Sequence, residues 1–342
     1  MQFPKTDNLN NPIYTKFFSD SELEVKVYNT IWRGVTSNNS FCFINPEVKY
    51  KQRENEVLNK LKEVFEIESG SFDEKYRMAI SGDGQEVKRI STLHSSSLAA
   101  LLLLYSVSES KPLKCILDKN NYTFNKSFFE VKTNVSENSH PSNMDVVLVG
   151  KNSENKDVIF FLESKFSEYF HTGMCNNISL DTYRDKYCAL GLIGKGDAIV
   201  GLHFTEGKGK DDVKCLQITS GEPQYCSGIK QMISHFIGVT NFAEKGEEAM
   251  DPKQKKFPFF DEILKLQKSG AEILLGEVLF RFDSTVDQAD SKLSKYSFIY
   301  EKLAEILNDN TTKVRVLPEV LTYQKLLEDF ELDKNVKAFY RL

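Results

Sequence analysis

The sequence predicts an α/β protein with a mixed β-sheet core flanked by helices. Its 342 residues are 40% hydrophobic and 27% charged, so the chain can bury a sizeable core without disulfide or metal support. Before residue 110 apolar residues recur at helical spacing, and after Lys111-Pro112 the spacing changes to two. Helical patterns return further along the chain and enclose one more apolar run of strand length. Strands placed between helical segments in this way are typical of a sheet covered by helices.

Composition excludes several classes of protein. With 44 Lys and Arg against 49 Asp and Glu, the formal net charge is −5, so a nucleic-acid partner must be met by a local basic patch. The six cysteines are scattered, without disulfide-scaffold or zinc-ribbon spacing, which favours a reducing cytoplasm. The first residues lack the features of a signal peptide, and the longest apolar run, 98–105, is too short to cross a bilayer. We therefore expect a cytoplasmic protein without a membrane partner.

The N-terminal region predicts three helices. Ser19 and Glu22 form a capping box that opens a helix to about residue 32. From Arg53 onward, apolar residues at i, i+3 or i+4, and i+7 predict a second helix with one face toward a core. The serines at 95–97 cap a third helix, which is apolar on nearly every side and should be buried.

Three strands in quick succession predict an antiparallel meander. The first centres on 128–135, where side chains alternate in character, and the second covers 144–149. The third covers 158–166 and follows a polar hairpin loop over 150–156. Loops this short join neighbouring antiparallel strands.

The remainder predicts an insertion and then a return to the core. Residues 167–226 are polar, with a helix expected from the Ser179 cap and strands at 198–204 and 213–218. A helix over 227–239 carries Gln231 and His235 four residues apart. The charged residues 244–256 predict a flexible loop. An interior strand (273–280), a helix (296–307), a strand (313–317) and a helix (323–330) complete the chain.

No repeat, low-complexity tract or Pro/Gly-rich linker divides the sequence. We expect a single α/β domain over 1–342. It would comprise a helical N-terminal extension (1–110), a core (120–282) with an insertion at about 167–226, and C-terminal helices and a strand (283–342).

Most catalytic motifs are absent. The Gly-Lys pairs lack a glycine five positions earlier and a following Ser or Thr, and no GxSxG is present, so neither a phosphate loop nor a nucleophile elbow is expected. The five histidines lack metal-ligand spacing. Lys253, Lys255 and Lys256 could contact phosphates, but a solvated loop is the favoured explanation.

One constellation remains, formed by Asp145, Glu163 and Lys165. Glu163 and Lys165 are two apart, so a strand places them on one face, and Asp145 enters the otherwise apolar preceding strand. Antiparallel pairing sets the start of one strand opposite the end of the next, which brings the three together. Two carboxylates suit Mg²⁺, and without a metal they should repel each other. A salt bridge at the rim of the sheet is the alternative interpretation.

The run Pro141-Ser142-Asn143-Met144-Asp145, followed by Glu163-Ser164-Lys165, resembles the PD-(D/E)XK nuclease superfamily. The resemblance implies a restriction-endonuclease-like core in which Asp145, Glu163 and the Ser164 carbonyl bind Mg²⁺ and Lys165 is the catalytic lysine. Gln231 is placed like the glutamine that some branches carry on the following helix. Those branches often have tyrosine four residues later, where this chain has His235. Glu130 on the preceding strand is a candidate auxiliary acid.

The resemblance implies a Mg²⁺-dependent endonuclease, with Mn²⁺ as a substitute, that hydrolyses phosphodiester bonds of nucleic acid and of DNA in particular. A homodimer would supply the two active sites that cleavage of both strands of a duplex often requires. Two alternatives stay open: a non-catalytic nucleic-acid-binding or assembly module on the same fold, and a plain α/β protein in which the three residues form an ion-pair network.

Overall fold

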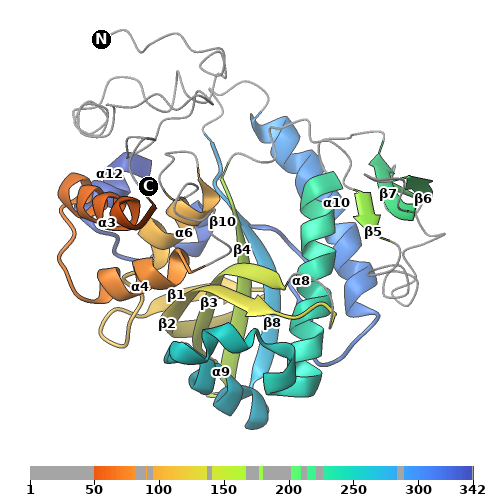
Figure 1. Cartoon of the computed structure of the whole chain (residues 1–342), viewed down its shortest axis with the longest axis horizontal. Helices are drawn as coiled ribbons and strands as arrows, with labels where there is room; N and C mark the ends of the chain where they lie inside the picture. Colours follow the sequence, from red (N-terminus) through yellow and green to blue (C-terminus); the bar gives the residue numbers. More distant parts are fainter. Residues whose placement is uncertain are drawn as a thin grey trace, which may run out of the picture.

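The computed structural model describes residues 50–81, 90, 95–136, 141–166, 177–179, 202–208, 214–220, 226–282, 289–340 and 342. The predicted helix over 19–32 lies outside these residues. Within them the protein is a mixed α/β structure built on a curled sheet with helices on both faces (Figure 1).

The main sheet has the strand order β1-β2-β3-β4-β8-β10, with β9 also paired to β8. Its first four strands are consecutive and antiparallel, whereas β4, β8 and β10 run parallel. The strands are β1 (Leu113–Leu117), β2 (Asn120–Thr133), β3 (Ser142–Asn152), β4 (Asp157–Lys165), β8 (Glu272–Leu279), β9 (Arg315–Val316) and β10 (Leu321–Thr322).

The predicted antiparallel meander is confirmed as β2, β3 and β4. Val146 in β3 is opposite Phe129 on one side and Leu162 on the other. Sequence reasoning missed the β1–β2 hairpin, and β2 begins earlier than expected. The hairpin turns at Asp118 and Lys119, whose φ angles are 45° and 65°. Two positive φ angles suit a tight hairpin turn, which usually contains glycine or asparagine, so this turn lacks the usual sequence signal.

The predicted interior strand over 273–280 is also confirmed. β8 pairs in parallel with β4 along its whole length, and the register places Glu277 beside Glu163. Seven of its eight residues are buried. A strand covered on both faces needs apolar side chains on both, which is why its sequence lacks alternation.

Helices cover the two faces of the sheet. The helix α6 (Ser96–Leu104) packs on β3 and β4, and the Ser95 side chain caps it by accepting a hydrogen bond from Leu98 N at 3.2 Å. All its residues from Ser97 to Leu104 are buried, as predicted. The opposite face carries α8 (Cys226–Lys245) and α9 (Phe259–Lys268), and α10 (Ala289–Asn308) runs beside α8 (Figure 1).

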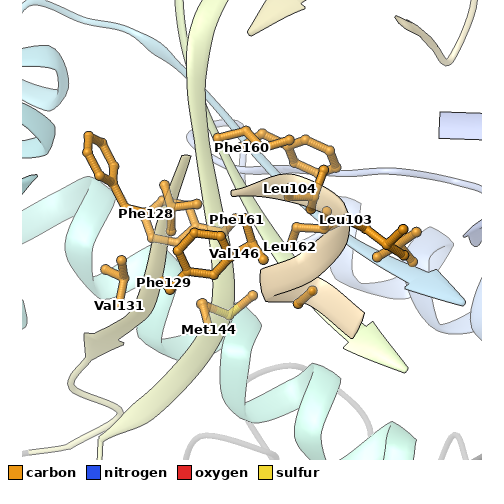
Figure 2. Close-up of a cluster of buried hydrophobic side chains, with 14 of the residues drawn as sticks. Leu103, Leu104, Phe128, Phe129, Val131, Met144, Val146, Phe160, Phe161 and Leu162 are labelled. Carbon is orange, nitrogen blue, oxygen red and sulfur yellow. The ribbon is translucent and has the colours of Figure 1, made fainter. Parts of the chain in front are cut away.

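Alternation along β4 determines which residues meet which helix. Phe160 and Leu162 lie with the α6 side chains Leu103 and Leu104 (Figure 2). Phe161 instead contacts Phe242 of α8, with ring centroids 5.6 Å apart. Because neighbours point to opposite faces, Glu163 and Lys165 belong with Phe161 on the α8 face.

The other helices lie around this core. They are α3 (Tyr50–Phe65), α4 (Ser71–Ala79), α11 (Tyr323–Leu326) and α12 (Lys334–Tyr340). Helical structure in the described part of the N-terminal region agrees with expectation, but the last predicted helix, 323–330, is wrong in extent. It ends at Leu326, and α12 follows as a separate helix. Among the described helices, none has both the length and the apolar composition that crossing a membrane requires.

The predicted insertion contains a small separate sheet. Its strands are β5 (Asn177–Ser179), β6 (Leu202–Lys208) and β7 (Lys214–Ser220), in the antiparallel order β5-β7-β6. The two expected strands are thus present at shifted bounds, and the helix expected from Ser179 lies outside the described residues. Ser179 itself is the last residue of β5, where it pairs with Cys215 of β7.

The prediction of a flexible loop over 244–256 is wrong. Two 3₁₀ helices, Gly246–Ala249 and Pro252–Lys256, occupy it. Gln254 is 2% exposed, and its side-chain amide accepts from Lys132 N at 2.8 Å and donates to Glu130 O at 2.5 Å. One buried glutamine therefore replaces a strand partner for β2 and fastens the charged segment to the sheet.

A glycine sets the distance between α8 and the meander. A Cβ on Gly238 would lie 2.4 Å from Thr133 Oγ1 and 3.2 Å from both Thr133 O and Ser142 Cβ. The helix can approach β2 and β3 this closely only without a side chain at this position. His235 is one turn away on the same helix, so this contact also positions the polar residues of α8.

We predict that Gly238→Ala lowers the free energy of unfolding by about 1–3 kcal/mol, because the added methyl group overpacks the helix–sheet contact. Alanine otherwise stabilises a helix relative to glycine. Urea unfolding measures the change, with the half-buried Ser234→Ala in the same helix as the matched control. Equal or greater stability of Gly238→Ala would show that α8 is not held against the strands.

Candidate active site

The sequence-predicted residues meet where β3 begins, β4 ends and α8 crosses them. Glu163 and Lys165 come from β4, Gln231 and His235 from successive turns of α8, and Asp145 from β3. Four of them, Glu163, Lys165, Gln231 and His235, form one continuous set of polar contacts.

Glu163 is at the centre of this set and is only 4% exposed. Its Oε1 accepts a hydrogen bond from Lys165 Nζ at 2.5 Å. Its Oε2 lies 3.1 Å from His235 Nε2, within ion-pair distance. Burial raises the pKa of the Glu163 carboxyl, but Lys165 and His235 outweigh burial and lower this pKa to about 2. The carboxyl is therefore ionised at neutral pH.

Lys165 has a second partner on the helix. Its Nζ donates to Gln231 Oε1 at 2.8 Å as well as to Glu163. Lys165 is 4% exposed, whereas Gln231 is exposed. Gln231 thus lies on the solvent-facing side of the cluster, and a ligand would reach Lys165 from that side.

His235 connects the cluster to β3. Its Nδ1 shares a hydrogen bond with the hydroxyl of Ser142, and both side chains are buried. Ser142 is the first residue of β3 and contacts the helix close to Gly238. The sequence did not indicate His235 as a metal ligand, and its role was left open. The structure places it between Ser142 and Glu163.

Asp145 is held by the backbone of the Glu163-Ser164-Lys165 motif. Its Oδ2 accepts from Ser164 N at 2.9 Å, and its Oδ1 accepts from Ser97 Oγ at 3.4 Å. The β3–β4 ladder ends one residue away, at the pair Val146 and Leu162. The Asp145 carboxylate therefore takes over the pairing of the strand at the point where the ladder stops.

The Ser164 side chain points the other way, toward α6. Its hydroxyl donates to Ser96 O at 3.0 Å and is 2.7 Å from Tyr323 OH. The first turn of α6 and the buried Tyr323 thus fix the residue that separates Glu163 from Lys165.

Glu130 lies on β2 between the residues that pair with Val146 and Met144, which places it opposite Asp145. It is 5% exposed and has a φ of 51°, which is uncommon for a residue inside a strand. The hydrogen bond that the Gln254 side chain donates to the carbonyl of Glu130 stabilises this conformation. Its role as an auxiliary acid stays a prediction.

Sequence reasoning missed Glu277. It is fully buried in β8, beside Glu163 in the parallel register, and its Oε2 accepts from Tyr296 OH at 2.6 Å. Burial, followed by the charge of Glu277, raises the pKa of Tyr296 well above its usual value. An acidic residue inside an apolar strand was the signal that identified Asp145, and the same signal is present at Glu277.

The carboxylate oxygens of the site are ligands of the type that Mg²⁺ prefers. Within the described part of the chain, no three His, Cys, Asp or Glu side chains form a metal-binding group. Mg²⁺, however, usually takes one or two carboxylates together with water and substrate oxygens. Asp145 and Glu163 supply two, and the ionised Glu163 already binds one cation, the ammonium of Lys165. A metal at Glu163 would have to replace that ammonium.

Comparisons of the chain with models of known protein families, with curated proteins and with solved structures find no match.

We predict that Glu163→Gln lowers the free energy of unfolding by about 3 kcal/mol or more, because it removes the anion that the buried ammonium of Lys165 contacts at 2.5 Å. This replaces the expectation from sequence that repulsion between carboxylates dominates the site. Glu247→Gln is the matched control, since Glu247 and its partner Lys255 are both half exposed and the pair should contribute little. Unchanged or higher stability of Glu163→Gln in urea unfolding would show that the ion pair is not formed.

Proposed function

We propose that the protein is a Mg²⁺-dependent nuclease that hydrolyses phosphodiester bonds of nucleic acid. One observation carries the proposal: the Asp145 carboxylate is bonded to the amide between Glu163 and Lys165. An acid, a second acid and a lysine thus lie at adjacent strand ends, with a polar edge at Gln231. This is the set of groups that metal-assisted phosphodiester hydrolysis requires.

The order of elements supports the same proposal. The helix α6 precedes the meander β2-β3-β4, and α8 then leads to β8, which pairs in parallel with β4. This arrangement resembles the restriction-endonuclease-like core. We propose that fold for residues 120–282, with the sheet β5-β7-β6 as an insertion.

Each residue has a distinct proposed role. Asp145 and Glu163, together with the Ser164 carbonyl, would hold Mg²⁺. When bound, the metal polarises the phosphodiester and lowers the pKa of a water molecule. Lys165 would contact the phosphate or the attacking water and stabilise the negative charge that develops. Gln231 orients Lys165 through its amide oxygen.

We propose DNA as the substrate, bound by a local basic surface since the chain is acidic overall. Lys253, Lys255 and Lys256 belong to the segment that Gln254 fastens to β2. We propose a cytoplasmic location, because the six scattered cysteines lack the spacing of a disulfide scaffold. A homodimer remains part of the proposal for duplex cleavage.

The structural ion-pair interpretation has an observation in its favour. Lys165 and His235 occupy both oxygens of Glu163, and all three side chains are almost fully buried. Such a network could simply close the end of the sheet. A purely structural network, however, would lose nothing but stability on substitution, whereas the nuclease would lose cleavage in variants that stay folded.

We predict metal-dependent cleavage that depends on Asp145 and Lys165. Plasmid, single-stranded DNA and RNA would be incubated with wild type in Mg²⁺, Mn²⁺ or chelator. Asp145→Asn should lose about 100-fold or more in rate because it weakens the hold on Mg²⁺. Lys165→Met should lose as much because it removes a preorganised positive charge at the reacting phosphate. Glu305→Gln, whose exposed ion pair with Lys302 lies on α10, should cleave like wild type.

Two outcomes would contradict the nuclease. Cleavage that persists in chelator would remove the metal from the reaction. Variants that cleave like wild type would assign Asp145 and Lys165 to structure alone. Binding of DNA without cleavage in any metal would favour the alternative of a non-catalytic nucleic-acid-binding module.

A further inference from the structure

The two oxygens of Glu163 are held in different ways. Oε1 faces the ammonium of Lys165, and Oε2 faces the imidazole of His235. The two partners differ in how firmly they are themselves fixed, and that difference has a consequence for any cation that binds Glu163.

His235 is fixed on both sides. Its ring lies between Glu163 and Ser142, is almost fully buried, and comes from a helix that Gly238 sets close to the strands. With Nε2 only 3.1 Å from Oε2, a cation at the usual Mg²⁺–oxygen distance of about 2.1 Å has no room on that side. The side of Oε2 that faces the ring is therefore closed to a metal while His235 stays in place.

Lys165 does not depend on Glu163 alone for its position. Its long side chain has two acceptors at once, Glu163 Oε1 at 2.5 Å and Gln231 Oε1 at 2.8 Å. Rotation about its flexible stem can break the first contact while the second persists. Gln231 is on the solvent side, so such a movement carries the ammonium toward a ligand at the surface.

We propose that Glu163 has one exchangeable oxygen, Oε1, at which Lys165 and a divalent cation exclude each other, and that His235 is a positioning residue that keeps Oε2 closed. Gln231 retains the lysine when it leaves Oε1. This inference rests on the proposed nuclease function, because the cation is the one that function requires. It gives His235 a role that sequence reasoning left open.

The consequence is that cation binding and lysine release occur together. A cation on Oε1 requires Lys165 to leave Glu163 while it stays on Gln231, where its charge is available to a phosphate. In the absence of the cation, Lys165 neutralises the buried carboxylate and stabilises the fold. Removing Lys165 should therefore strengthen cation binding even though it abolishes cleavage.

Calorimetric titration with Mn²⁺, without substrate and at neutral pH, tests the exchange. Lys165→Met should bind Mn²⁺ about tenfold more tightly than wild type, because a competing charge of measurable coupling energy is gone. Gln231→Ala should bind more weakly than wild type, because Lys165 then loses the acceptor that would retain it when it leaves Oε1. Glu247→Gln, an exposed acid in an ion pair of its own, should match wild type.

The role of His235 is tested in a double-mutant cycle. In the His235→Leu background Oε2 is open, so Mn²⁺ can bind without displacing Lys165. Lys165→Met should then change affinity by less than about threefold, and the missing gain measures the coupling between the two residues. If Lys165→Met is too unstable to titrate, Lys165→Gln removes the charge and retains a hydrogen-bond donor.

The results separate this inference from the proposed function. If wild type binds Mn²⁺ and Lys165→Met binds it equally tightly, the exchange is wrong and the nuclease proposal stands. If His235→Leu abolishes Mn²⁺ binding, His235 is itself a ligand and its positioning role is wrong. If neither wild type nor any variant binds Mn²⁺, both the exchange and the metal-dependent function are overturned.

Discussion

The central constraint in this structure is the buried charge of Glu163. A carboxylate that is 4% exposed pays a large desolvation cost and stays ionised only beside groups that favour its charge. Lys165 comes from the same strand, two residues away, and His235 comes from a helix distant in sequence. The end of β4 and the middle of α8 are therefore tied together by one charge, and neither can move without exposing it or leaving it unpaired.

Several features of the fold make this arrangement possible. The absence of a side chain at Gly238 lets α8 approach the strands, and Ser142 fixes the far side of the His235 ring. On the other face, α6 and Tyr323 hold Ser164, whose amide binds Asp145. The two carboxylates thus depend on opposite layers of the protein. The strand ends where they meet are therefore held from both layers.

The part of the fold that follows from local pattern could be predicted from the sequence. Alternation and short loops predict the meander, and the apolar run predicts the interior strand that β8 forms. Two-residue spacing placed Glu163 and Lys165 on one face. Antiparallel pairing of the two strands then predicted that Asp145 lies beside the end of β4. The structure places its carboxylate there, bonded to the amide of Ser164.

Features that depend on long-range contacts could not be predicted in this way. Nothing local to Gln254 shows that its amide replaces a strand partner for β2, so its segment looked like a solvated loop. His235 has no metal-ligand spacing, and its contact with Glu163 arises only from the close approach of α8. The sequence suggested that repulsion between Asp145 and Glu163 governs the site. The ion pair between Glu163 and Lys165 became apparent only in the folded geometry. Glu277 could have been noticed, since it is an acidic residue in an apolar strand. Its position beside Glu163 could not have been predicted, because it depends on the register between β8 and β4.

The most direct test of the central claim is a crystal structure of the protein soaked in Mn²⁺, with anomalous diffraction used to locate the metal. The account predicts one Mn²⁺ at about 2.1–2.2 Å from Glu163 Oε1 and from a carboxylate oxygen of Asp145. It also predicts that Lys165 Nζ has moved off Glu163 while remaining on Gln231, and that His235 still faces Oε2. A crystal that holds no metal at this position, with Lys165 still on Glu163, would contradict the account and leave these residues as a structural ion-pair network.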